Sequence, residues 1–235
     1  MLEIQIYYDK KEELNYYLKK LYFLDKLSTD NTNIDFKREM ASDNYSLTDF
    51  ILILKSNSFM MMYNMVESTV KEIIYAIYDQ INISKVTYKK INSDLKKLWE
   101  TYQFRHLIKN RQAKQDTYEN QVHETIKMAI SRRSISLDHD NLKLSGNADF
   151  DVISEIFYEM GINIKQEKIA KYSGNLADIK THRNDLAHGG TSFIESARDT
   201  SISDLFSMAS NVENCLEQII KIANDYVENE EFKEK

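Results

Sequence analysis

The chain has 235 residues, no proline, five glycines, one cysteine and a formal net charge of −6. A single cysteine excludes an internal disulfide framework and a cysteine-based zinc cage, and the acidic charge argues against a general nucleic-acid coat protein. Because there is no apolar signal-peptide core and no apolar run of the ~18 residues that a membrane span needs, we expect a soluble cytoplasmic protein.

The first half of the chain has helical periodicity. Residues from about 9 to 27 predict an amphipathic helix, and the polar stretch that follows predicts a loop. A second helix is expected to begin near Ser46, where Ser46 and Asp49 have the spacing of a capping box, and to run to about residue 82. The apolar cluster from Phe59 to Tyr63 is broader than one helix face requires. This helix is therefore expected to be central to a bundle or to lie in a dimer interface.

The second half predicts further helices around one irregular segment. Residues from about 84 to 131 predict one or two helices, and the alternating pattern of 131–146 predicts a short hairpin or an extended insert. Helices are then expected from about Asp149 to Gly161, from about residue 166 or 175 to 187, and from about 203 to 228. No linker rich in Gly, Pro or Ser and no internal repeat interrupts the chain. The sequence thus predicts one all-α domain over residues 1–235.

A basic segment offers a possible surface for RNA. Between Lys85 and Lys114 there are nine Lys or Arg residues and two acidic residues, with aromatic residues interleaved. A surface that follows a phosphate backbone has this composition. A solvated helix face with its aromatic side chains in the core has the same composition, so both interpretations stay open. The candidate substrate-binding residues are Lys96, Lys97, Arg105, Lys109 and Arg111.

The hexapeptide 183–188, with the sequence RNDLAH, is the strongest functional signal. Its arginine continues the apolar stripe of a predicted helix (positions 176, 179 and 186), so Arg183 is expected to face the interior or an interface, where a guanidinium needs a partner or an anion. Asn184 lies four residues before His188 and can fix its tautomer by a hydrogen bond, as Asp185 also could. Two glycines then end the helix. The structural alternative is a helix C-terminus that favours histidine, with the arginine salt-bridged into the core.

Arg133 and His139 form a rival pair. They fall in the irregular segment, no amide residue follows the arginine, and no helical frame holds the two side chains in register. The first pair is therefore preferred.

The hexapeptide resembles the R-polar-x3-H motif of the HEPN superfamily, whose members are α-helical bundles. The resemblance extends to residues 59–70, which resemble the first core helix of a bacterial HEPN-like nuclease branch. Residues 144–149, with the sequence LSGNAD, resemble the link of that branch into its next helices. Ser192-Phe193 and the long terminal helix complete the order. The resemblance covers about residues 45–230, which leaves 1–44 as an N-terminal helical extension.

This resemblance implies a metal-independent endoribonuclease that needs no cofactor. It implies that Arg183 holds the scissile phosphate, that His188 is the general acid or base, and that Asn184 orients His188, with products ending in a 2′,3′-cyclic phosphate and a 5′-OH. The supporting residues are Asp185, Glu67, Tyr63 and Asn64. Glu67 either pairs with Arg183, supports the cleft, or is a plain surface glutamate.

The resemblance also implies partners. HEPN domains typically form homodimers with a composite active site, and such proteins are associated with toxin–antitoxin or antiphage functions. Some HEPN toxins carry a tyrosine two residues after the histidine, which a partner enzyme modifies with AMP, but position 190 here is glycine. Control by a separately encoded antitoxin or defence partner stays open. The alternative function is a non-catalytic HEPN dimer that binds nucleotide or RNA or acts as a scaffold.

Overall fold

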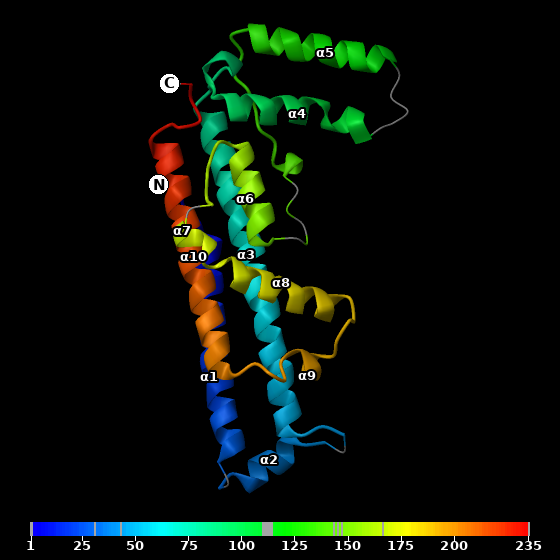
Figure 1. Ribbon diagram of the computed structural model, residues 1–235, viewed down its shortest axis with the longest axis vertical. Helices are drawn as coiled ribbons and strands as arrows, with labels where there is room; N and C mark the ends of the chain where they lie inside the picture. Colours follow the sequence, from blue (N-terminus) through cyan, green and yellow to red (C-terminus); the bar gives the residue numbers. More distant parts are fainter. Residues whose placement is uncertain are drawn as a thin grey trace.

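Three long helices form the frame of the molecule: α1 (Gln5–Thr29), α3 (Leu47–Ile83) and α10 (Ile202–Glu228). The structure is a computed structural model that describes residues 2–30, 32–42, 44–109, 115–142, 144, 146, 148–165 and 167–234, without the side chains of 106–109, 115 and 167. The three helices run alongside one another, and α3 packs against both of the others (Figure 1). With 37 residues and neither proline nor glycine, α3 is about 55 Å long.

Shorter helices surround this frame. They are α2 (Ile34–Met40), α4 (Ser93–Lys109), α5 (Gln115–Ile130), α6 (Phe150–Glu159), α7 (Glu167–Ala170), α8 (Ser173–Ala187) and α9 (Phe193–Ser196). Helix α8 crosses the middle of α3, while α4 and α5 lie across one end of the bundle (Figure 1). No strand occurs among the described residues, which have only two isolated β-bridges, so the all-α prediction is confirmed.

The ends of the helices follow the sequence signals. Ser46 and Asp49 form the predicted capping box of α3, and Ser201 starts α10 with a second one. Asp149 caps α6, where its side chain accepts a hydrogen bond from the amide of Val152 at 2.9 Å. These side chains satisfy amides that have no partner within the helix, so α3, α6 and α10 each begin where a side chain supplies an acceptor.

Helix α3 is the centre of the hydrophobic core, as its broad apolar surface predicts. Phe59, Met62 and Tyr63 are all buried, and buried residues continue along the helix to Ile81. The N-terminal helix α1 packs along α3 and buries Tyr7 and three leucines, so it is part of the same bundle. None of the described helices combines the length and hydropathy of a membrane span.

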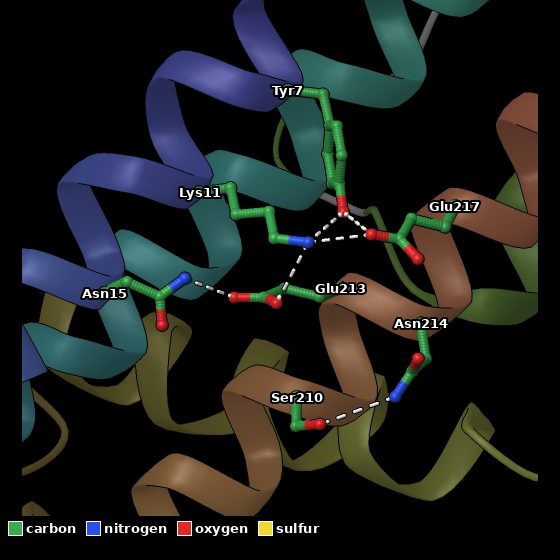
Figure 2. A network of polar contacts seen from close by, with 7 residues as sticks. All are labelled: Tyr7, Lys11, Asn15, Ser210, Glu213, Asn214 and Glu217. Carbon is green, nitrogen blue, oxygen red and sulfur yellow. Dashed lines mark hydrogen bonds and ion pairs between the residues drawn. The ribbon is translucent and has the colours of Figure 1, made fainter.

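A polar network fastens α1 to α10 (Figure 2). The Lys11 ammonium donates to Glu217 at 2.7 Å and to the hydroxyl of Tyr7 at 3.2 Å, and it lies 3.3 Å from Glu213. Asn15 donates to the other oxygen of Glu213 at 2.8 Å. The bonds from Lys11 and Tyr7 lower the pKa of Glu217. Because each contact needs matched positions on both helices, the network sets the register of α1 along α10.

The described part of the irregular segment (131–142, 144 and 146) forms an extended insert and contains no hairpin. Ser134 forms an isolated antiparallel bridge with Thr87, and a 3₁₀ turn, η2, covers His139–Asn141. Ile135 and Leu137 are buried, whereas Ser134 and Ser136 are exposed. The alternation of apolar and polar residues that suggests a hairpin comes from one extended segment, which has one face on the core. The described residues provide no second strand of a hairpin.

Candidate functional site

Two aromatic side chains of α3 contact the C-terminal part of α8, which carries His182 and Arg183. The ring of His182 stacks on Phe59 with centroids 4.0 Å apart and an interplanar angle of 3°. One turn along α3, the Arg183 guanidinium lies over the ring of Tyr63, 4.5 Å from its centroid. Phe59 and Tyr63 are four residues apart and therefore on one face of α3. Consecutive residues of α8 thus rest on consecutive turns of the central helix.

Arg183 is half-buried and has no carboxylate partner within the described part of the chain. Its Nη1 donates to Oδ1 of Asn184 at 2.8 Å, which is a neutral acceptor. Leu176, Ile179 and Leu186 are buried on the same helix, which confirms the predicted stripe. A guanidinium held in place by a ring and an amide keeps its full positive charge available for an anion.

The segment before α6 is braced against α3 beside Arg183. The hydroxyl of Tyr63 accepts from the amide of Ala148 at 3.1 Å, and the carboxylate of Glu67 accepts from the amide of Gly146 at 3.1 Å. Burial raises the pKa of Tyr63, with the charge of Glu67 adding to the effect and Arg183 opposing it. Tyr63 is therefore a neutral phenol near neutral pH. One tyrosine holds both the arginine, through its ring, and the link segment, through its oxygen.

An ion pair joins the same link to α8. The Lys180 ammonium lies 2.6 Å from the carboxylate of Asp149, and both side chains are less than a quarter exposed. Burial opposes ionisation of Asp149, but Lys180 and the amide of Val152 together hold its pKa below the ordinary value. Helices α3, α6 and α8 are thereby tied together around Arg183.

His188 is exposed at the C-terminus of α8. Its amide donates to the carbonyl of Asn184 at 2.9 Å, and the amide of Gly190 donates to the carbonyl of Asp185 at 2.7 Å. Gly189 has φ +71°, a left-handed conformation that ends the helix and that glycine adopts without strain. The imidazole is thus presented to solvent five positions after the guanidinium, where it can exchange a proton with a bound substrate.

The structure places the predicted supporting residues Asn184, Glu67 and Asp185 as follows. The side-chain oxygen of Asn184 is bound to Arg183, so this amide orients the guanidinium, while its backbone carbonyl holds His188. Glu67 accepts a hydrogen bond from the amide of Gly146 in the neighbouring link, and the described residues show no ion pair between it and Arg183. Asp185 is exposed, and its charge raises the pKa of His182 against the effect of burial. None of these contacts was visible from helical spacing alone.

Asn64 lies apart from the other predicted residues. It is exposed on α3 and lines a small hollow with Lys10 and Glu13 of α1 and Met61 of α3. Tyr63, its neighbour in sequence, points instead toward α8. Adjacent residues on a helix differ by about 100° in direction, which separates Asn64 from the arginine.

The basic segment lies mostly on α4, away from α8 (Figure 1). Lys96 forms an ion pair with Glu234 at 2.8 Å, Arg105 donates to the carbonyl of Asn141, and Lys97 is largely exposed. The side chain of Lys109 and the whole of Arg111 lie outside the described residues. The aromatic residues Tyr88, Trp99, Tyr102 and Phe104 are buried or half-buried. The Lys97 ammonium also lies 3.9 Å from the carboxylate of Asp94. Each of these three basic side chains therefore has a polar contact within the chain.

Sequence reasoning missed His182 and Lys180. His182 is half-buried, and its Nδ1 lies 3.0 Å from the hydroxyl of Ser196 on α9, beyond the glycine turn. Burial lowers its pKa, so the ring is neutral near neutral pH. His182 lies three residues after the buried Ile179, and this spacing was the available signal for its inward position. The pairing of Lys180 with Asp149 crosses two helices and left no signal in the sequence.

The rival histidine belongs to a different environment. His139 stacks on Tyr75 with centroids 4.0 Å apart, and its Nε2 lies 3.0 Å from Asp79. Arg133 is exposed, and its amide donates to Ser131 at 3.2 Å. The two residues thus lack the common helical frame that holds Arg183 and His188.

Comparisons with known proteins give one family. The family model described as HEPN_MAE_28990-like HEPN matches residues 10–232. The match begins within α1 and therefore includes the helix that was expected to be an extension. No curated protein and no solved structure gives a significant match. Within the described ranges, no group of three or more His, Cys, Asp or Glu side chains is placed to hold a metal ion.

Proposed function

The chain belongs to the MAE_28990-like HEPN family. Because HEPN domains in general are ribonucleases, we propose that it is a metal-independent endoribonuclease. The observation that carries the proposal is the environment of Arg183. It is half-buried on Tyr63, is oriented by Asn184, and has no carboxylate partner among the described residues. A guanidinium in this position suits a phosphodiester, which supplies the missing negative charge.

The reaction proposed is an internal transfer at phosphorus. The ribose 2′-OH loses its proton and attacks the adjacent phosphate, and the bond to the 5′-oxygen breaks as that oxygen gains a proton. The products are a 2′,3′-cyclic phosphate and a 5′-OH end. Arg183 stabilises the charge that develops on the phosphate oxygens. His188 either removes the first proton or supplies the second. DNA lacks the 2′-OH and is not a substrate.

The site is proposed to be composite, with two copies of the chain each supplying one Arg183 and one His188. One imidazole in a single copy can be either the base or the acid at a given moment, whereas two imidazoles can take both roles in one step. Asn184 and Tyr63 orient the arginine, and Glu67 and Asp149 hold the link beside it. The chain is further proposed to be a toxin or antiphage effector in the cytoplasm, controlled by a separately encoded partner.

The test is cleavage of a single-stranded RNA in EDTA by the wild type, Arg183→Ala and His188→Ala. We expect cyclic-phosphate ends from the wild type, at least a 100-fold loss in each variant (on the order of the 10²–10⁴ that such groups contribute), and unchanged melting temperatures. Arg133→Ala and His139→Ala are matched controls, because they alter the rival pair, and both should cleave normally. Cleavage that EDTA abolishes, or full activity in both site variants, would reject the proposal.

A second candidate function is a non-catalytic HEPN dimer that binds RNA or nucleotide or acts as a scaffold. The contacts of Arg183 with Tyr63 and Asn184 favour it, because they also suit a structural arginine. This alternative predicts no cleavage of any RNA, and it predicts that Arg183→Ala lowers the melting temperature. The same set of variants therefore separates the two functions.

A further inference from the structure

The chain between α8 and α10 returns to the central helix through the short helix α9 (Figure 1). This return segment begins with His188 and two glycines, and all three residues are exposed. A Cβ added at Gly189 would meet no atom within 4 Å, so the surroundings leave the turn free space. Because little packing fixes the turn itself, its position depends on where the segment after it is held.

Contacts with α3 hold the far half of the return segment. The buried hydroxyl of Ser56 donates to the carbonyl of Phe193, and the Lys55 ammonium donates to the carbonyl of Thr200 at 3.1 Å. Ala197, directly after α9, is fully buried. These contacts fasten α9 and the residues after it to the central helix. None of them reaches α8, where the candidate site lies.

His182 joins α8 to α9. Its Nδ1 lies 3.0 Å from the hydroxyl of Ser196, and its ring is fixed by stacking on the buried Phe59 at 4.0 Å between centroids. Within the described part of the chain, no other side-chain hydrogen bond links these two helices. We call this hydrogen bond the α8–α9 clamp. It closes a loop of the chain from residue 182 to residue 196, and that loop contains both Arg183 and His188.

The clamp acts on the last turn of α8. Two hydrogen bonds form this helix end: the amide of His188 donates to the carbonyl of Asn184 at 2.9 Å, and the amide of Gly190 donates to the carbonyl of Asp185 at 2.7 Å. Helix ends open more readily than helix centres, because few packed contacts oppose the opening. Here the turn is tied on both sides, so it cannot unwind without displacing α9 unless the clamp opens first.

We propose that His182 is a positioning residue, which holds His188 in place relative to Arg183 through the α8–α9 clamp. The proposal rests on the proposed ribonuclease function, in which Arg183 holds the phosphate and His188 transfers a proton. Proton transfer requires the imidazole within hydrogen-bond reach of the reacting oxygen. Loss of the clamp should therefore slow the chemical step, while the phosphate still binds to Arg183.

The first test does not need catalysis. His182→Phe keeps a ring on Phe59 but removes Nδ1, and Ser196→Ala removes its partner. Exchange of the His188 and Gly190 amides with deuterium, measured by NMR, should become about 2- to 12-fold faster in each variant, the range that the loss of one hydrogen bond gives. The double variant should exchange no faster than either single variant, because both changes remove the same bond.

His139→Phe is the matched control. His139 also stacks on an aromatic ring, Tyr75, at 4.0 Å between centroids, and its Nε2 also has a partner, Asp79, at 3.0 Å. This variant should leave exchange at His188 and Gly190 unchanged. Additive effects in the double variant, or wild-type exchange in both single variants, would overturn the proposal. Exchange that rises equally along α3 would overturn it too, because the role of the histidine would then be purely structural.

The second test is steady-state RNA cleavage by the same variants. His182→Phe and Ser196→Ala should lower kcat by at least the factor seen in exchange and leave KM within about twofold, since only the proton-transfer group is displaced. His182→Asn has an amide atom where Nδ1 lies and should restore part of kcat. A raised KM with unchanged kcat would refute positioning of His188. If the wild type cleaves no RNA, the proposed function fails, while the exchange measurement still decides whether the clamp holds the turn.

Discussion

The double contact of Tyr63 makes it the most informative residue to change. Tyr63→Phe keeps the ring beneath Arg183 but removes the oxygen that accepts from the buried amide of Ala148. An unsatisfied buried amide costs about 1–3 kcal/mol, so we expect the free energy of unfolding to fall by that amount. The guanidinium keeps its support, and the rate of RNA cleavage by the folded protein should stay within about twofold of the wild type.

Tyr63→Leu removes the oxygen and the ring together. A cation–π contact contributes about 0.5–1 kcal/mol at an exposed site and ~2 when desolvated. If this energy holds Arg183 in its productive position, cleavage should slow by about 2- to 30-fold, in addition to the loss of stability. The two variants therefore separate the structural role of the oxygen from the positioning role of the ring.

Tyr102→Leu is the matched control. Tyr102 is a buried tyrosine with Arg105 stacked over it at 4.7 Å, and its hydroxyl also has a partner, Tyr78, at 2.7 Å. This variant should lose stability and keep its cleavage rate. The measurements are urea unfolding for stability and single-turnover cleavage below the unfolding transition. If Tyr63→Leu cleaves as fast as Tyr102→Leu, the ring does not position the arginine, and the reasoning fails.

Three further predictions concern stability. Burial lowers the pKa of His182 below its ordinary value of 6.5. Between these two pKa values the unfolded chain binds more protons than the folded chain, so the free energy of unfolding falls as the pH drops through that range. His182→Gln should reduce this fall in pH-dependent urea titrations; an unchanged profile would contradict it. Lys11→Met leaves the half-buried Glu213 without its ammonium and should cost about 1–2 kcal/mol, less in high salt. A loss that is independent of salt would argue against an electrostatic origin. Ser201→Ala should cost about 1 kcal/mol in thermal unfolding by removing a cap, whereas Ser207→Ala within the same helix should not.

Helices were the predictable part of the fold because their signals are local. The capping residue Ser46 and the glycine at 161 act within one turn, so the sequence alone locates the ends that they define. The last helix was expected from about residue 203, and its cap at Ser201 was not predicted. The insert at 131–146 shows the limit of such signals. Ile135 and Leu137 are buried because one face of this extended segment is covered. The alternating sequence predicts that one face is covered, but it does not distinguish cover by a second strand from cover by the helical core.

The inward position of Arg183 was predictable from the sequence, but the contacts of the candidate site were not. The stripe of α8 pointed Arg183 inward, and the structure places it over Tyr63. The partners of Tyr63 and Glu67 depend on which turn of α8 meets which turn of α3, and on the path of the link segment beside them. These contacts depend on long-range packing, since Tyr63 and Arg183 are 120 positions apart in the sequence. Spacing along one helix carries no information about them.

The uninterrupted length of α3 has a consequence for the motions of the site. Phe59, Tyr63 and Glu67 lie in the middle of a helix of 37 residues, covered by α1, α8, α9 and α10. Fraying from either end must undo several packed turns before it reaches them, and no glycine or proline offers a hinge. The amides of residues 59–67 should therefore exchange with deuterium only when the whole domain opens. The part of α3 that supports Arg183 is therefore as stable as the whole fold. Any conformational change on substrate binding is expected in the glycine turn after His188.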